Sequence, residues 1–116
     1  MIDKSYSLDM LPMDPIPVVE VSQYDTDFQI LMLLYASNGD LDLSGTSATL
    51  RGRKPDGTPY EKAVYKTGQS VVLQGDTNLT DVAGKGIYEI CLTSQSKDLH
   101  TSNFILRVEP SPGGRE

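Results

Sequence analysis

Residues 38–57 limit the fold more than any other stretch, because their pattern is that of a turn, a strand and a second turn. Asn38-Gly39-Asp40 is typical of a turn, since Asn and Gly adopt positive φ at low cost. Ser47 to Arg53 alternates between small or apolar residues and polar ones, which is the period of a half-buried strand. Lys54-Pro55-Asp56-Gly57 then predicts a turn with positive φ at Gly57.

Short strands are predicted along the whole chain, separated by glycine, proline and polar turns. The seven prolines and ten glycines leave few segments long enough for a helix. A polar hairpin loop is predicted at 94–99, and one irregular or 3₁₀ turn at 76–84. Seven or eight strands of this kind predict an all-β, antiparallel, immunoglobulin-like β-sandwich, with a small barrel as the alternative. The predicted strands are 18–21, 28–35, 47–53, 60–66, 70–73, 86–93 and 101–109.

The chain is expected to form one domain with a short segment on either side. Its 116 residues suit a single domain with a real hydrophobic core. Residues 1–17 carry three prolines and predict an N-terminal arm or a short first strand. The β-sandwich domain is placed at 18–110. Residues 111–116 have the composition of a linker toward a downstream domain.

Charge and composition argue against several classes of partner. A net charge of −6 and a pI near 4.6 disfavour nucleic acid. The longest apolar run, Ile30 to Ala36, is too short to span a membrane, and residues 1–15 lack the apolar core of a signal peptide. The single Cys91 excludes an internal disulfide, and we expect no cysteine-based zinc site.

No motif predicts catalysis, a cofactor or a metal. His100 is the only histidine, and only Asp98 lies near it in sequence, so we expect neither residue to be catalytic. Residues 40–45 imitate the first half of a calcium loop, but Arg51 stands where the bidentate glutamate belongs. A polar turn with Leu41 and Leu43 as apolar anchors is the better interpretation. We therefore predict a non-enzyme.

The predicted strand 28–35 is apolar on both faces. Because a strand in a sandwich meets the core with one face only, the second face needs cover from the N-terminal arm or from a partner protein. The turn after this strand favours a hairpin with 47–53. The second face predicts an interface made by Leu31, Leu33 and Tyr35.

Arg51 and Arg53, with Lys54 beside them, form the one basic cluster of the sequence. On the outward face of a strand they make either a solvated surface or a docking patch for an acidic partner. Arg51 and Arg53 are therefore included among the candidate interface residues.

Several motifs, in a fixed order, resemble the N-terminal domain of phage baseplate upper proteins, from tailed phages and prophages of Gram-positive bacteria. The similarity covers roughly Val18 to Glu109. A polar lead-in comes first, followed by a turn, a strand ending in a second turn, and two later segments. These are Gln23 to Asp27, Asp42-Leu43-Ser44-Gly45, Ala48 to Gly57, Thr80 to Tyr88, and Thr101-Ser102-Asn103-Phe104.

The resemblance implies a structural component of a phage or prophage tail baseplate. In such phages this domain anchors a receptor-binding or tail-fibre assembly to the central tail hub. It implies partnership with the hub protein, other baseplate subunits or another copy of the chain, and a location in the virion after synthesis in the bacterial cytoplasm. A carbohydrate-binding β-sandwich module is the alternative. Such a module would need exposed aromatic side chains, whereas this chain has no Trp and six scattered Tyr.

Overall fold

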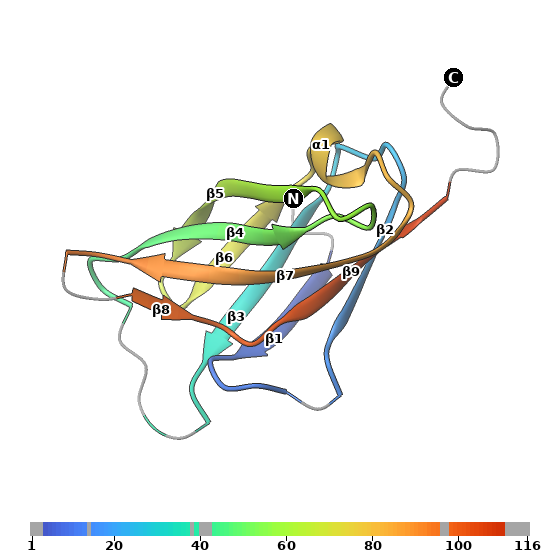
Figure 1. Ribbon diagram of the computed structural model, residues 1–116. Coiled ribbons are helices and arrows are strands. Elements are labelled where there is room, and N and C mark those ends of the chain that lie inside the picture. Colours follow the sequence, from blue (N-terminus) through green and yellow to red (C-terminus); the bar gives the residue numbers. More distant parts are fainter. Residues whose placement is uncertain (1–3, 14, 38, 40–42, 96–97, 111–116) are drawn as a thin grey trace.

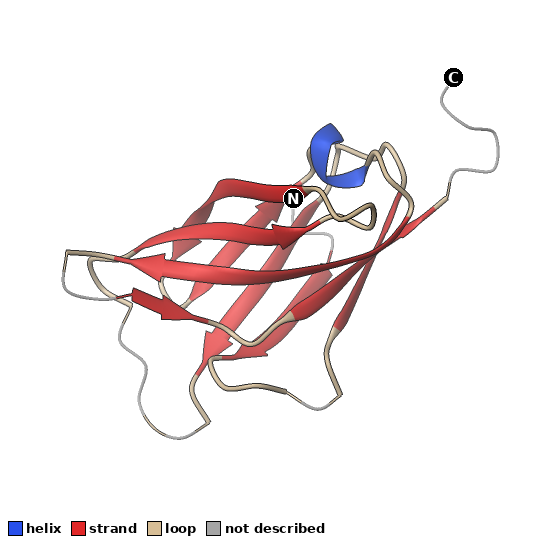
Figure 2. Ribbon diagram, in the orientation of Figure 1, coloured by secondary structure: helices blue, strands red, loops and turns tan. Residues whose placement is uncertain are grey.

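The computed structural model describes residues 4–13, 15–37, 39, 43–95 and 98–110 (Figure 1). Strands dominate these residues, and the only helix among them has four residues (Figure 2). This confirms the all-β class. The elements are β1 (Lys4–Asp9), β2 (Val18–Ser22), β3 (Gln29–Tyr35), β4 (Ser47–Arg53), β5 (Pro59–Thr67), β6 (Ser70–Gln74), α1 (Thr77–Thr80), β7 (Gly84–Thr93), β8 (Asp98–His100) and β9 (Phe104–Glu109).

The nine strands of the described residues form one curled, mixed sheet, which resembles a half-barrel. Its order is β1-β3-β6-β5-β4-β7-β9-β2, with β8 pairing with β7. In Figure 1, β4 and β7 cross in front of β1, β3 and β6. We call β1, β3 and β6 the back layer, and β4, β7, β8, β9 and β2 the front layer. Because β5 pairs with both β6 and β4, it joins the two layers.

The antiparallel, immunoglobulin-like arrangement expected from the sequence is not confirmed. β1 pairs with β3 in parallel, and β2 pairs with β9 in parallel. These two pairs lie at opposite ends of the strand order, so the proline-bearing segment between β1 and β2 connects one edge to the other. A proline-bearing connection suits this path because proline cannot donate a hydrogen bond to a sheet.

The predicted hairpin between 28–35 and 47–53 is wrong. β3 pairs with β1 and β6, whereas β4 pairs with β5 and β7. The chain therefore passes from the back layer to the front layer between these strands. Of the predicted turn between them, residues 38 and 40–42 lie outside the described residues.

The core lies between the two layers and is built by alternate residues of each strand. Residues 1–17, expected to be an arm or a first strand, contribute β1, whose Leu8 is fully buried. In the front layer the ring of Tyr88 packs against Tyr60, edge to face, and against Phe104. The least exposed core side chains are Leu8, Val19, Ile30, Met32, Leu34, Val71, Leu73, Leu79, Tyr88, Ile90, Leu92, Phe104 and Val108.

The last predicted strand begins later than expected. Residues 101–109 were assigned to it, but β9 starts at Phe104, and part of the predicted loop 94–99 forms β8. Thr101 and Ser102 interrupt the strand because they bond to other elements. The Thr101 hydroxyl accepts from the Ile90 amide at 3.0 Å, and the Ser102 amide donates to the Asp9 carbonyl at 2.8 Å. Residues 96–97 of the predicted loop, and the predicted linker 111–116, lie outside the described residues.

The predicted irregular turn at 76–84 contains one turn of α-helix instead. The Asp76 carboxylate caps it by accepting a hydrogen bond from the Asn78 amide. The same carboxylate accepts from the Tyr60 hydroxyl at 2.8 Å, which ties α1 to β5. Leu79 and Thr80, the last two residues of α1, are buried.

Gly57 has the predicted positive φ, at +88°. Its amide donates to the Lys54 carbonyl at 2.8 Å, and a Cβ at this position would meet nothing within 4 Å. The cost of a side chain here is therefore backbone strain alone. We expect Gly57→Val to lower the free energy of unfolding by about 1–3 kcal/mol, measured by urea denaturation. Gly57→Asn is the control and should cost less, because Asn adopts positive φ more readily. Equal stability of the Val variant and the wild type would contradict the argument.

Candidate functional site

An apolar stripe crosses the outer face of the back layer and joins β5. We call it the apolar stripe and define it as Leu31, Leu33, Tyr35, Tyr65 and Val72. Leu33, Tyr35 and Tyr65 are 46%, 37% and 69% exposed, and the other two are half-buried. Leu31, Val72 and Tyr65 lie level with one another on β3, β6 and β5. Exposed apolar groups gathered in this way are typical of a contact surface.

The described part of the N-terminal segment does not cover this stripe. β1 lies beside β3 in the same sheet, so it extends the layer instead of crossing its outer face. Ser5 and Ser7 pair with Leu31 and Leu33 in this register and are both exposed. Cover by the arm was one of the two alternatives for the predicted interface, and the other is a partner protein.

Arg51 and Arg53 lie on β4, on the outer face of the front layer, and so belong to a different surface from the apolar stripe. Arg51 is paired in the sheet with Glu61 on one side and Glu89 on the other, and its Nη2 lies 3.4 Å from Glu89 Oε2. Arg53 donates to the Gly57 carbonyl at 3.0 Å, which braces the turn. Both arginines therefore have acceptors within the chain.

The motifs that carry the family resemblance meet at the end of the molecule near α1. Lys54 Nζ contacts Asp81 Oδ1 at 2.5 Å, and the Lys54 side chain is largely buried, at 10% exposed. The Gln23 side chain donates to the Asp81 carbonyl at 3.0 Å, and the Thr80 hydroxyl donates to the Asp25 carbonyl at 3.1 Å. Three segments far apart in sequence are thus held together by these residues, which gives the motifs an architectural role.

The calcium-like stretch 40–45 lies partly outside the described residues, since 40–42 are not among them. Leu43 is buried, as expected of an apolar anchor. Its carbonyl accepts from the Thr46 hydroxyl at 2.7 Å and from Lys66 Nζ at 3.1 Å. This oxygen therefore already has a cationic partner from the chain itself.

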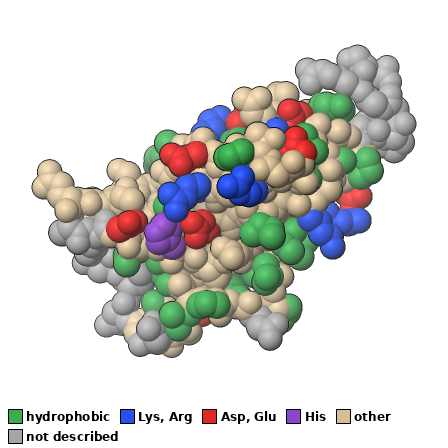
Figure 3. Space-filling model, in the orientation of Figure 1, with side chains coloured by type: hydrophobic (Ala, Val, Ile, Leu, Met, Phe, Trp, Pro, Cys, Tyr) green, Lys and Arg blue, Asp and Glu red, His purple; other side chains and the backbone are tan. Residues whose placement is uncertain are grey.

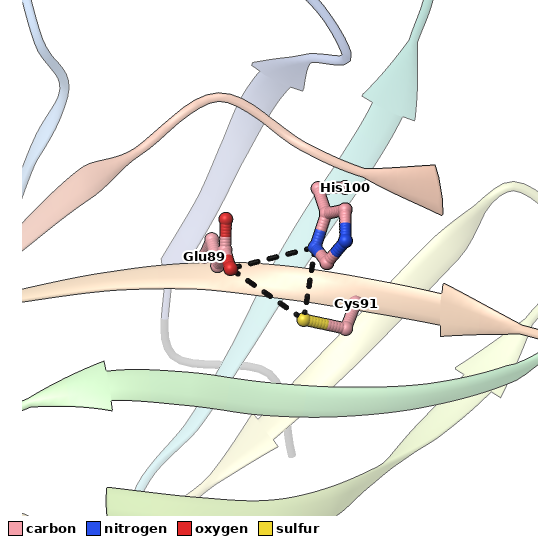
Figure 4. Close-up of side chains that lie close together, drawn as sticks. All are labelled: Glu89, Cys91 and His100. Atoms are coloured by element: carbon pink, nitrogen blue, oxygen red, sulfur yellow. Dashed lines mark hydrogen bonds and ion pairs between the residues drawn. The ribbon is translucent and has the colours of Figure 1, made fainter. Parts of the chain in front are cut away.

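The structure brings Glu89, Cys91 and His100 together on the outer face of the front layer (Figure 4). Glu89 and Cys91 project from the same face of β7, and His100 is the sheet partner of Cys91 on β8. Cys91 Sγ lies 3.2 Å from His100 Nδ1 and 3.7 Å from Glu89 Oε2. In Figure 3 the one histidine lies between acidic side chains, with basic side chains beside them.

This cluster was not predicted from the sequence, because neither Cys91 nor His100 has a suitable partner at a recognisable spacing along the chain. A signal was present: the alternation of 86–93 places Glu89 and Cys91 on one outward face. Burial, and after it the Glu89 carboxylate, raises the pKa of the Cys91 thiol. A nucleophilic cysteine needs the opposite shift, so this arrangement does not favour nucleophilic catalysis.

Among the comparisons with known proteins, only the one with solved structures finds a similar protein. No protein-family model matches the chain, and no curated protein matches it. Among solved structures, the N-terminal domain of phage TP901-1 ORF48 is similar, with a TM-score of 0.71 and 12% sequence identity. The similarity covers 91% of this chain and 98% of that one. At the level of the fold, it confirms the resemblance to a phage domain that the motif series indicated.

Within the described part of the chain, no helix has the length and apolar character needed to cross a membrane.

Proposed function

We propose that this chain is a structural domain of a phage or prophage tail baseplate, and that it anchors a receptor-binding or tail-fibre assembly to the central tail hub. The observation that carries the proposal is the fold shared with a phage domain over nearly the whole length of both chains. The order of the motifs supports it, because the residues of three of them contact one another and maintain that fold. In this role the domain is a component of the virion.

The apolar stripe is the docking surface in this proposal. Leu33, Tyr35 and Tyr65 are large side chains left exposed on a regular sheet. Full burial of a large apolar side chain is worth roughly 1.5–3 kcal/mol, and each of the three would gain the part of this that its present exposure leaves. The partner is the hub protein, another baseplate subunit or a second copy of this chain. Arg51 and Arg53 form a second, polar candidate surface on the front layer, suited to an acidic partner.

The docking surface is tested with a Leu33→Asp, Tyr35→Asp double variant. Both side chains are exposed, so we expect the variant to fold, as judged by circular dichroism. We expect it to bind the tail hub protein of the same phage or prophage at least about 10-fold more weakly, because buried aromatic and aliphatic anchors dominate such interfaces. Binding is measured by pull-down and self-association by light scattering.

Ile87→Asp is the control, because it introduces a charge of the same sign at an exposed apolar position on the front layer. Loss of hub binding in the double variant alone supports the apolar stripe. Loss in Ile87→Asp alone moves the docking surface to the front layer, beside Arg53, its neighbour in the sheet. A hub that binds none of these proteins, wild type included, contradicts the proposed function.

The carbohydrate-binding alternative has one observation in its favour, the exposure of Tyr35 and Tyr65 on the same outer face. The sheet register places Tyr65 level with Leu31, two side chains along the face from Tyr35 and two strands away. The two rings therefore do not form one continuous platform. Binding on a glycan array that is lost in Tyr65→Ala, with no hub capture, would favour this alternative.

A further inference from the structure

The cluster of Glu89, Cys91 and His100 has a ligand set and a placement that the proposed structural function does not use. A carboxylate, a thiolate and an imidazole are all ligands of zinc in proteins, and the Cys91 thiol would release its proton to solvent on binding the ion. They come from two paired strands, so the sheet fixes their spacing: Cys91 faces His100 across β7 and β8, and Glu89 lies two residues from Cys91 on the same face. Sites on strands are held more precisely than sites on loops.

The distances between the three donor atoms are close to those along one face of a zinc tetrahedron. With zinc bonds of about 2.3 Å to sulfur and about 2.0–2.2 Å to nitrogen and oxygen, the ligands of a tetrahedral site lie about 3.4–3.6 Å apart. The observed separations are 3.2 Å for Cys91 Sγ to His100 Nδ1, 3.4 Å for His100 Nδ1 to Glu89 Oε2, and 3.7 Å for Glu89 Oε2 to Cys91 Sγ. A metal ion could therefore be held without a change in the backbone.

The histidine is also oriented as a metal ligand would be. Its Nε2 lies 3.4 Å from the Asp98 carboxylate, while Nδ1 is directed at Cys91 and Glu89. A proton on Nε2 leaves the Nδ1 lone pair free for a metal. A carboxylate on the far nitrogen is the usual outer partner of a zinc-binding histidine, because it fixes the tautomer and the ring.

The position of the cluster leaves room for one further ligand. Cys91 is buried, at 5% exposed, whereas the His100 side chain is 40% exposed, so the cluster has a closed side and an open side. Three protein ligands with an open fourth position, filled by water, is the geometry of many zinc centres.

One neighbouring group opposes a cation here. Arg51 Nη2 lies 3.4 Å from the same Glu89 oxygen that would bind the metal. The Arg51 side chain is half exposed, so it can turn into solvent when a doubly charged ion competes for the carboxylate. Exposed ion pairs of this kind contribute little, and the competition therefore weakens the site without abolishing it.

We propose that Glu89, Cys91 and His100 bind a zinc ion on the outer face of the front layer, with Asp98 holding the histidine and water completing the coordination. This departs from the expectation that a single cysteine gives no zinc site. The ion would fasten the short strand β8 to β7. The proposal does not depend on docking through the apolar stripe, which lies on the other layer. Arg51, which also belongs to the second candidate docking surface, is its one link to the proposed function.

The test uses untagged protein in a phosphine reductant and cobalt(II) as a spectroscopic substitute for zinc. We expect a thiolate-to-cobalt charge-transfer band in the near ultraviolet, the strong visible bands of tetrahedral cobalt, and loss of both when zinc is added. Cys91→Ser should remove the charge-transfer band. Substitution of a residue that only hydrogen-bonds a metal ligand weakens metal binding by up to roughly 100-fold. His100→Gln, at a partly exposed position, removes a ligand itself and should weaken cobalt binding by more than that.

Two further variants separate a built site from a chance contact. Asp98→Asn should weaken binding about 10-fold, because it replaces the carboxylate beside Nε2 with a neutral amide, which is a weaker acceptor. Arg51→Gln should tighten binding by up to about fivefold, because it removes the competing cation. A cobalt spectrum without a charge-transfer band overturns the proposal, and so does a band that persists unchanged in His100→Gln. Should Cys91→Ser fail to fold, the wild-type spectrum and His100→Gln still decide the question.

Discussion

Gly52→Ala is expected to lower the free energy of unfolding by about 3 kcal/mol or more. Gly52 lies on β4 between Tyr60 on β5 and Tyr88 on β7. A Cβ added there would lie 2.7 Å from Tyr88 Cα, 2.8 Å from Tyr88 Cδ1 and closer still to the Ile87 carbonyl oxygen. Two of these atoms belong to the backbone of the adjacent strand, which no side-chain rotation can move aside. β4 and β7 would therefore have to move apart at this point of the sheet.

The free energies of unfolding of the Gly52→Ala and Gly57→Ala variants are measured by urea denaturation and compared with that of the wild type. Gly57 has open space around its Cα and a positive φ, so its substitution carries backbone strain without a clash, about 1 kcal/mol. We expect Gly52→Ala to exceed it by about 2 kcal/mol. If the two variants lose equal stability, β4 and β7 adjust to the extra methyl group, and the close approach at Gly52 is not essential to the fold.

Alternation in the sequence predicted the positions of strands and the faces they present. Leu50 points into the core and Arg51 points out, as the pattern of 47–53 requires. The strand 28–35 is buried on one face, and Leu33 and Tyr35 on the other are exposed. These properties depend on local periodicity, which a sequence carries directly.

The neighbours of each strand could not be predicted in the same way. Periodicity fixes which side chains share a face, but it does not fix which strand lies alongside. The parallel pairing of β1 with β3 joins two segments separated by all of β2, and no local signal marks it. The expected hairpin between 28–35 and 47–53 failed for this reason.

The candidate zinc cluster could not be predicted for the same reason, because it depends on which strand lies beside β7 and in which register. Glu89 and Cys91 could be placed on one face from the pattern of 86–93 alone. His100 reaches them only because β8, three residues long, pairs with β7 in a particular register. A strand that short has no periodicity of its own, so its sequence was interpreted as the end of a polar loop.

Phe104→Ala is expected to cost about 3–5 kcal/mol of stability, because it removes a fully buried aromatic ring and leaves a cavity. Phe104 is the first residue of β9 and follows the irregular stretch that contains Thr101 and Ser102. It pairs with Tyr88 on β7. The two ring centres are 6.2 Å apart. Loss of this contact removes packing from the centre of the front layer and weakens the anchoring of β9.

Tyr88→Phe is the matched control for this cavity, because it keeps the ring and removes only the hydroxyl. Among the described residues, the buried Tyr88 hydroxyl has no hydrogen-bond partner, and burial, with the charges of Asp56 and Asp81, raises its pKa to about 12. Removing an unpaired buried hydroxyl should leave the stability within about 1 kcal/mol of the wild type. Both variants are compared by thermal and urea denaturation. If Tyr88→Phe is as damaging as Phe104→Ala, the hydroxyl must be bound by an ordered water, and the centre of the front layer is held by a polar contact as well as by ring packing.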